Sequence, residues 1–208
     1  MLIKRLRMVA TLALSLLGIQ HSAHAASWIE SSNGDMSNSG LSPSSLSLNH
    51  GSNPISGNFG APDLDYLAVT VPPGFVLSAI VTGVSNNTGL SRSFIGVQAG
   101  SVMTVPPNAS SAAGLLGWTH YGGADGVNLL PSIAIPKSGS TGFTPPLAAG
   151  TYTFWFNEVS SGTGLTYDFD FQVQAAVASN PTQVPMPLPA LIALALMLVT
   201  TGMLRRRS

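Results

Sequence analysis

Several oxygen-bearing side chains near the start of the chain have the composition of a site for a hard cation. Glu30, Asn33 and Asp35 are closely spaced in a segment rich in serine, asparagine and glycine. Asp63 and Asp65 open a predicted strand and lie on one of its faces. Because Ca²⁺ takes about six to eight oxygen ligands, mostly carboxylates and carbonyls, these residues are candidate calcium ligands. The alternative is a solvated acidic turn in which aspartates cap backbone N–H groups.

The residues with catalytic potential do not form a recognisable catalytic group. Asp168 and Asp170 lie on one face of a predicted strand, where a carboxylate pair can serve glycoside hydrolysis or form the wet face of a half-buried sheet. His50 and His120 are the histidines outside the N-terminal segment, and neither lies near a Gly-x-Ser-x-Gly or in a His-x-x-x-His pair. We favour the interpretation that Asp168 and Asp170 lie on the solvent-exposed face of the sheet. We therefore assign no catalytic residue and expect a protein that is not an enzyme.

Three aromatic residues are candidates for contact with a ligand. Trp118, Tyr121 and Trp155 offer flat faces on which sugar rings can stack. Aromatic side chains buried in a β-sandwich core explain the same residues equally well. Both interpretations remain open from the sequence.

The formal net charge of zero conceals an acidic body between two basic ends. All eight acidic residues lie in the body, which keeps two of the eight basic residues and so has a net charge of about −6. Since binding to phosphates depends on lysine and arginine, this acidic body argues against nucleic acid as a partner. The chain has no cysteine, which excludes disulfides, thiolate metal sites and cysteine catalysis. The basic residues of the ends are Lys4, Arg5, Arg7, Arg205, Arg206 and Arg207.

Alternation of apolar and polar residues predicts an all-β body. With 22 glycines and 15 prolines in the chain, the pattern indicates a single antiparallel β-sandwich or jelly roll at residues 26–174. We expect the two aromatic strands near its end to pair as a hairpin across a glycine-containing loop. The expected strands are residues 45–48, 63–71, 75–84, 93–98, 114–121, 132–135, 151–158 and 167–173.

Residues 1–25 have the three parts of a secretory signal peptide. A basic region precedes an apolar run at residues 8–19, and Ala23 and Ala25 form a small-x-small site with cleavage expected before Ala26. The run of about 12 apolar residues is too short to span a membrane. We therefore expect export through the Sec translocon.

An uncharged apolar run at residues 188–204 predicts a transmembrane helix. About 17 helical residues span about 25 Å, and a thin bilayer or snorkelling arginines would absorb the small deficit against a ~30 Å hydrocarbon core. Arg205, Arg206 and Arg207 follow the run and should stay in the cytoplasm, which leaves the body outside it. Residues 175–183 form a small, polar linker to this tail.

Val184, Pro185, Met186 and Pro187 precede the apolar run and its basic end. Together, residues 184–208 resemble the PEP-CTERM family of sorting signals, in which a Pro-x-Pro box precedes an apolar span and a short basic end. Met186 stands where the common form has glutamate, as in Val-Pro-x-Pro variants. The resemblance implies a Gram-negative bacterium, processing by an exosortase, and an inner-membrane precursor delivered to the cell surface or extracellular matrix.

Three pieces of the body carry a second resemblance. They are residues 30–35, residues 51–57 with the strand at 63–71 and its following turn at 72–74, and residues 149–154. These pieces are similar to the bacterial pre-peptidase C-terminal domain, a small jelly-roll β-sandwich found in secreted proteases and surface proteins. Some of these domains bind calcium or matrix polymers. The resemblance implies that acidic residues at such positions can hold calcium between the N-terminal segment and a strand.

The sequence therefore predicts an exported, non-enzymatic cell-surface or matrix protein that is associated with biofilm or exopolysaccharide and sorted by an exosortase. One alternative is a calcium-stabilised module that binds polysaccharide or protein. A second alternative is a secreted hydrolase with a carboxylate pair. The expected partners are the exosortase, the Sec translocon, the inner membrane and extracellular polysaccharide.

Overall fold

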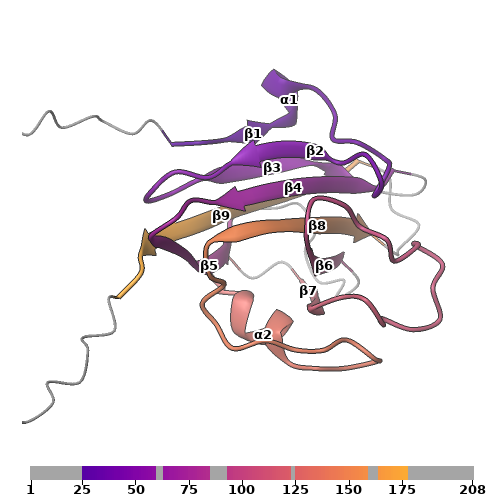
Figure 1. The fold of residues 1–208 in the computed structure, drawn as a ribbon. Coiled ribbons are helices and arrows are strands. Elements are labelled where there is room, and N and C mark those ends of the chain that lie inside the picture. Colours follow the sequence, from indigo (N-terminus) through magenta and orange to yellow (C-terminus); the bar gives the residue numbers. More distant parts are fainter. Residues whose placement is uncertain (1–24, 60–62, 85–92, 123–124, 159–163, 178–208) are drawn as a thin grey trace, which may run out of the picture. The chain divides into compact units, whose positions relative to one another are not determined.

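A computed structural model describes residues 25–59, 63–84, 93–122, 125–158 and 164–177 (Figure 1). The chain divides into two compact units after Ala175, and the fold below belongs to the first. The expected signal peptide up to residue 24, the Pro-x-Pro box, the helix at residues 188–204 and the terminal arginines lie outside the described residues. Neither helix of the described part has the length and apolar character needed to cross a membrane.

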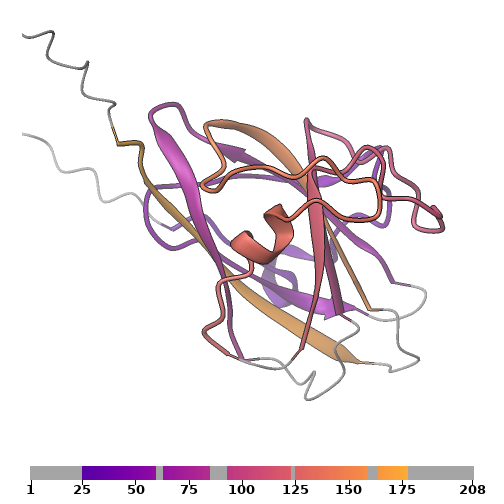
Figure 2. The same cartoon turned by 90° about the horizontal axis from the view of Figure 1, so that it is seen from below.

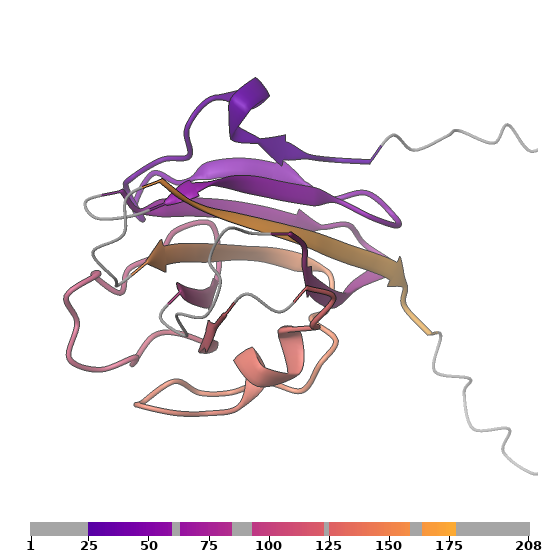
Figure 3. The ribbon, with the colours of Figure 1, turned by 180° about the vertical axis from the view of Figure 1, so that it is seen from behind.

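Two β-sheets pack together as a sandwich, which confirms the all-β prediction (Figures 1 and 3). Neighbouring strands are antiparallel, except that β1 runs parallel to β3 and β2 runs parallel to β4. In spatial order, the first sheet contains β1 (Trp28–Ile29), β3 (Pro54–Phe59), β9 (Leu165–Ala175) and β5 (Phe75–Thr82). The second sheet contains β2 (Ser44–Ser47), β4 (Asp65–Val71), β8 (Gly150–Glu158), β6 (Ser93–Ala99) and β7 (Gly117–Tyr121).

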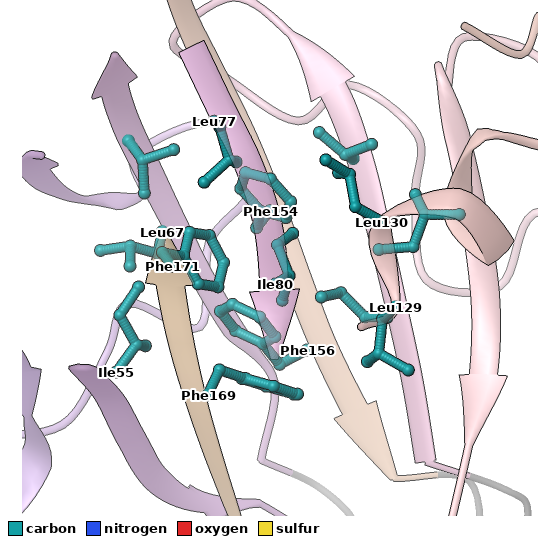
Figure 4. Close-up of a cluster of buried hydrophobic side chains, with 14 of the residues drawn as sticks. Ile55, Leu67, Leu77, Ile80, Leu129, Leu130, Phe154, Phe156, Phe169 and Phe171 are labelled. Carbon is teal, nitrogen blue, oxygen red and sulfur yellow. The ribbon is translucent and has the colours of Figure 1, made fainter. Parts of the chain in front are cut away.

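Aromatic side chains from both sheets fill the core. Strand β9 alternates as predicted, with its aromatic residues buried and Asp168 and Asp170 only half-buried. Phe171 of β9 meets Phe154 of β8 with ring centroids 5.0 Å apart. Figure 4 shows these two rings in the cluster of buried side chains. Packing of this kind explains why the sequence is richest in aromatic residues in its last two strands.

The predicted hairpin between the last two strands is wrong. Strand β8 pairs with β4 and β6 in the second sheet, whereas β9 pairs with β3 and β5 in the first. Each strand turns its aromatic face into the space between the sheets, and the two strands therefore contact through side chains rather than through backbone hydrogen bonds. A glycine-containing loop is compatible with both arrangements.

The strand predicted at residues 132–135 is also wrong, because this segment belongs to helix α2 (Leu130–Ala134). Leu130, Ile133 and Ala134 are buried, and their spacing of three and four residues is that of a helix face. Pro131 suits the first helical turn, where its missing N–H is not needed. Figure 2 shows α2 beside β7, which it contacts.

The remaining predicted strands are present, with small shifts of their ends. Two strands were not predicted, β1 and β3, and both contribute to the first sheet. Strand β3 buries Ile55 completely, but its neighbours include serine, glycine and asparagine, so it lacks a strong alternating pattern. The pairing of β1 with β3 matters for the site, because it places the following helix α1 (Glu30–Asn33) against the sheet.

Candidate functional site

Three of the predicted calcium ligands converge at one end of the sandwich. Single carboxylate oxygens of Glu30, Asp35 and Asp65 all lie within 4.8 Å of one another. We call these three residues the acidic centre. They come from the start of α1, the segment after α1 and the first residue of β4. No histidine belongs to the group, so its donor set among the described residues consists of hard oxygen ligands.

Local pairing of the N-terminal segment assembles this centre. The parallel register of β1 and β3 places Ile29 opposite Ser56 and brings the next residue, Glu30, beside β3. Further along, Met36 is buried in the core, and the N–H of Tyr66 donates to the carbonyl of Ser37 at 3.0 Å. The segment that carries Asp35 is thereby held next to the start of β4.

Asp65 is the most unusual member of the acidic centre. Its side chain is fully buried on the core-facing side of β4, and neither carboxylate oxygen has a hydrogen-bond partner among the described residues. The Tyr167 hydroxyl is close enough to lower the pKa somewhat, but it does not reach hydrogen-bond geometry with either oxygen. Burial, followed by the charges of Glu30 and Asp63, raises the pKa of Asp65 to about 8. A buried, unpaired carboxylate is unfavourable, so this position favours either a proton or a bound cation.

Glu30 ties the N-terminal segment to the first sheet through both carboxylate oxygens. Its Oε2 accepts a hydrogen bond from the N–H of Asn58 at 2.8 Å. Its Oε1 accepts from the N–H of Met36 and from the hydroxyl of Tyr167, both at 3.3 Å. Burial raises the pKa of Glu30 and the charge of Asp35 adds to the rise, while these hydrogen bonds oppose it. The carboxylate is therefore fixed in place beside Asp65.

Gly57 leaves the space that this arrangement needs. A Cβ added to Gly57 would overlap the Glu30 carboxyl group and would lie 2.5 Å from the Tyr167 hydroxyl. Gly57 pairs directly with Tyr167 across β3 and β9. Any larger residue at this position would displace the Glu30 carboxylate from the acidic centre.

The other two predicted ligands lie outside the converging trio. Asp63 is half-buried, and its pKa is raised by burial and then by the charge of Asp35. Asn33 closes the α1 turn, where its Oδ1 accepts a hydrogen bond from the N–H of Ile29 at 2.8 Å. Asp63 thus contributes to the negative potential at Asp65, and Asn33 shapes the turn that carries Glu30.

The Asp168–Asp170 pair has structural contacts. Asp170 Oδ1 accepts hydrogen bonds from the Ser52 hydroxyl at 2.7 Å and from the N–H of Asn53 at 3.0 Å. Its Oδ2 accepts from Gln172 at 3.1 Å. Burial raises the pKa of Asp168, and the charges of Asp170 and Asp125 add to the rise. Asp170 therefore anchors the loop before β3.

A cavity of about 280 Å³ lies on the outer face of the second sheet. Of the three aromatic residues predicted to meet a ligand, Trp118 and Trp155 line it, whereas Tyr121 is buried in the core 5.3 Å from the ring of Phe169. We call this space the aromatic cavity. Its lining comprises Phe94, Val105, Pro106, Pro107, Ala109, Ser110, Ser111, Ala112, Leu115, Trp118, His120, Ser138, Trp155 and Asn157.

Sequence reasoning missed two aromatic rings of this cavity, those of Phe94 and His120. Alternation along β6 and β7 could have identified them, because it places Phe94 and His120 on the face opposite the core residues Ile95 and Tyr121. The covering segment between β6 and β7 has no periodic pattern. Its packing over these strands could not be read from the residues alone.

Comparisons with known proteins leave the family open. No family model and no curated protein matches the chain. A crystal structure of Aeromonas hydrophila PliG, a periplasmic lysozyme inhibitor of g-type lysozyme, is 15% identical with a TM-score of 0.31. The match covers 63% of this chain and 96% of that chain. At this level of similarity we draw no inference from it.

Proposed function

We propose that this chain is an exported, non-enzymatic domain of the bacterial cell surface or extracellular matrix, stabilised by Ca²⁺ at the acidic centre. One observation carries the calcium proposal: Asp65 is fully buried without a hydrogen-bond partner and faces two further carboxylates within 4.8 Å. When all three groups are ionised, these carboxylates repel one another, so without a cation Asp65 keeps a proton. Ca²⁺ prefers such oxygen ligands and would neutralise this repulsion.

The proposed role of the ion is mechanical. Glu30 and Asp35 belong to the N-terminal segment, whereas Asp65 begins a strand of the second sheet. A cation held by all three joins this segment to the sandwich, and exposed Asp35 leaves the centre open to solvent for the remaining ligands. Since the unfolded chain has no preformed site, the binding free energy adds to the stability of the folded state.

The proposed route to the surface rests on the sequence of the two ends. Cleavage between Ala25 and Ala26 would leave every described strand intact, because β1 begins at Trp28. The box Val184-Pro185-Met186-Pro187 would be processed by an exosortase after the helix at 188–204 has held the precursor in the inner membrane. The mature domain would then associate with extracellular polysaccharide.

Calcium-dependent thermal unfolding tests the proposal. The full chain in detergent micelles is stripped with EDTA and melted over a Ca²⁺ series. At a free Ca²⁺ concentration near 100 times the dissociation constant, binding adds about 2.7 kcal/mol, which for a domain of this size raises the Tm by about 5–10 °C. Asp65→Asn should abolish the rise. A wild-type Tm that does not change with Ca²⁺ would remove the metal from this account.

A further inference from the structure

The aromatic cavity is built by two distinct parts of the fold. Its floor is the outer face of β6, β7 and β8, from which Phe94, Trp118 and Trp155 project. Its wall is the segment between β6 and β7, where Val105 and Leu115 pack with Trp155 in a second hydrophobic cluster. At about 280 Å³ the cavity is close to the lower end of the range of small-molecule pockets, about 300–1,000 Å³.

The floor is an aromatic surface. Phe94 lies 4.6 Å from Trp155 and 5.7 Å from Trp118 between ring centroids. His120 meets Trp118 edge-on at 5.4 Å. Aromatic rings present apolar faces that suit the C–H faces of a sugar ring, while the imidazole of His120 adds a polar edge.

Charge distinguishes the surroundings of this cavity from the other parts of the domain that the structure describes. Lys137 is the one lysine or arginine among the described residues, and its Nζ lies 4.9 Å from the centroid of the Trp118 ring. Trp118 donates its indole N–H to the Lys137 carbonyl at 3.2 Å, and Nζ donates to the Ser132 carbonyl at 3.3 Å. These contacts hold the ammonium group over the ring of Trp118, a residue that lines the cavity. None of the described lining residues is acidic.

Polar groups are also present within the lining. The indole N–H of Trp155 is buried and has no hydrogen-bond partner among the described residues. Asn157 and Ser110 add amide and hydroxyl groups. The amide of Asn157 and the hydroxyl of Ser110 can exchange hydrogen bonds with a hydroxyl-bearing ligand.

We propose that the aromatic cavity binds a uronic acid residue of an acidic polysaccharide, with the sugar ring against the aromatic floor and its carboxylate at Lys137. A neutral sugar would use the floor but not the ammonium group. This inference goes beyond the calcium-dependent role proposed above, and the two sites share no residue.

Calorimetric titration tests this assignment directly. The full chain in detergent micelles, with EDTA present to exclude calcium bridging, is titrated with oligogalacturonate and with a neutral oligogalactoside of equal length. A charge-assisted contact predicts that the acidic oligomer binds about tenfold or more tightly than the neutral one. Equal affinities, or no binding of either oligomer, would overturn the proposal.

Variants separate the charge from the aromatic floor. Lys137→Gln should abolish the preference for the acidic oligomer without loss of neutral binding, and Lys137→Arg should retain it. Trp118→Ala should weaken both oligomers, whereas Trp28→Phe, at a tryptophan whose N–H bonds to the Gly34 carbonyl outside the cavity, should change neither. Unfolding curves of each variant establish that it folds. A preference that survives in Lys137→Gln would contradict the assigned role of the ammonium group.

The outcome is independent of the calcium site. Asp65→Asn should leave oligogalacturonate binding unchanged while it abolishes the calcium response. Loss of the calcium response and loss of oligogalacturonate binding can therefore be told apart, and each tests a different proposal.

Discussion

Replacing Asp65 by asparagine removes the buried negative charge with almost no change of shape. The pKa of Asp65 is raised by burial from 3.8 to about 8 in the folded state. Between these two values the folded chain keeps a proton that the unfolded chain has lost, so this carboxyl stabilises the fold below about pH 4 and loses that contribution as the pH rises through about 8. At about 1.36 kcal/mol per pKa unit, the loss reaches at most about 6 kcal/mol.

Urea denaturation in EDTA measures this effect. Wild type and Asp65→Asn should have similar free energies of unfolding at about pH 3 and below, where the carboxyl is protonated in both states. Near pH 8 to 9 the variant should be more stable than the wild type by a few kcal/mol, because asparagine cannot ionise. With saturating Ca²⁺ the order should reverse, since only the wild type keeps all three carboxylates.

Asp125→Asn is the matched control, because it makes the same change of charge at an exposed position. Its pH profile should follow that of the wild type. Parallel profiles for wild type and Asp65→Asn would refute the reasoning, since they would mean that Asp65 is not held in an environment that opposes its ionisation.

Further predictions follow from packing and processing. Gly57→Ala should cost about 1–3 kcal/mol of stability in urea denaturation and weaken Ca²⁺ binding, because the added methyl displaces the Glu30 carboxyl; unchanged calcium affinity would contradict the role given to Gly57. Ile133→Ala should destabilise the fold by about 2–5 kcal/mol, whereas Ile135→Ala, at a side chain that is 58% exposed, should cost far less; equal costs would argue against α2 as part of the core. Mass spectrometry of the mature protein from its native host should find Ala26 at the N-terminus, and a C-terminus that still carries the terminal arginines would contradict exosortase processing.

The sequence predicted the elements whose pattern is set by a single buried face. Strand β9 is the clearest case, because Tyr167, Phe169 and Phe171 alternate with polar residues and only one face of the strand meets the core. Strand β4 was also predicted, although all of its residues except Thr70 are buried. Period-two alternation reports which side of a strand is buried, and it does so without knowledge of the partner strand.

Pairing partners could not be predicted in the same way. The hairpin prediction for β8 and β9 failed because two aromatic strands pack equally well across a sandwich and within one sheet. Helix α2 was mistaken for a strand because a short apolar run fits both periods. Strand β3 was missed because Gly57 and its polar neighbours contact Glu30 and β9 rather than the core, so the strand lacks an alternating apolar pattern.

The same limit applies to the candidate site. Sequence reasoning grouped the acidic residues, but it could not distinguish fully buried Asp65 from half-buried Asp63, since both lie on one face of the chain. The difference arises because β4 enters the core only at Asp65, beside Tyr167 of the opposite sheet. That contact depends on how the two sheets stack, which local patterns do not specify.

Proton release on calcium binding tests the central claim most directly. If Asp65 is protonated near neutral pH, Ca²⁺ must displace that proton, so calorimetric titration in buffers of different ionisation enthalpy should report about one proton released per ion at about pH 7. Asp65→Asn should neither bind the ion nor release a proton. The absence of calcium binding by the wild type, or binding without proton release, would contradict the account of the acidic centre.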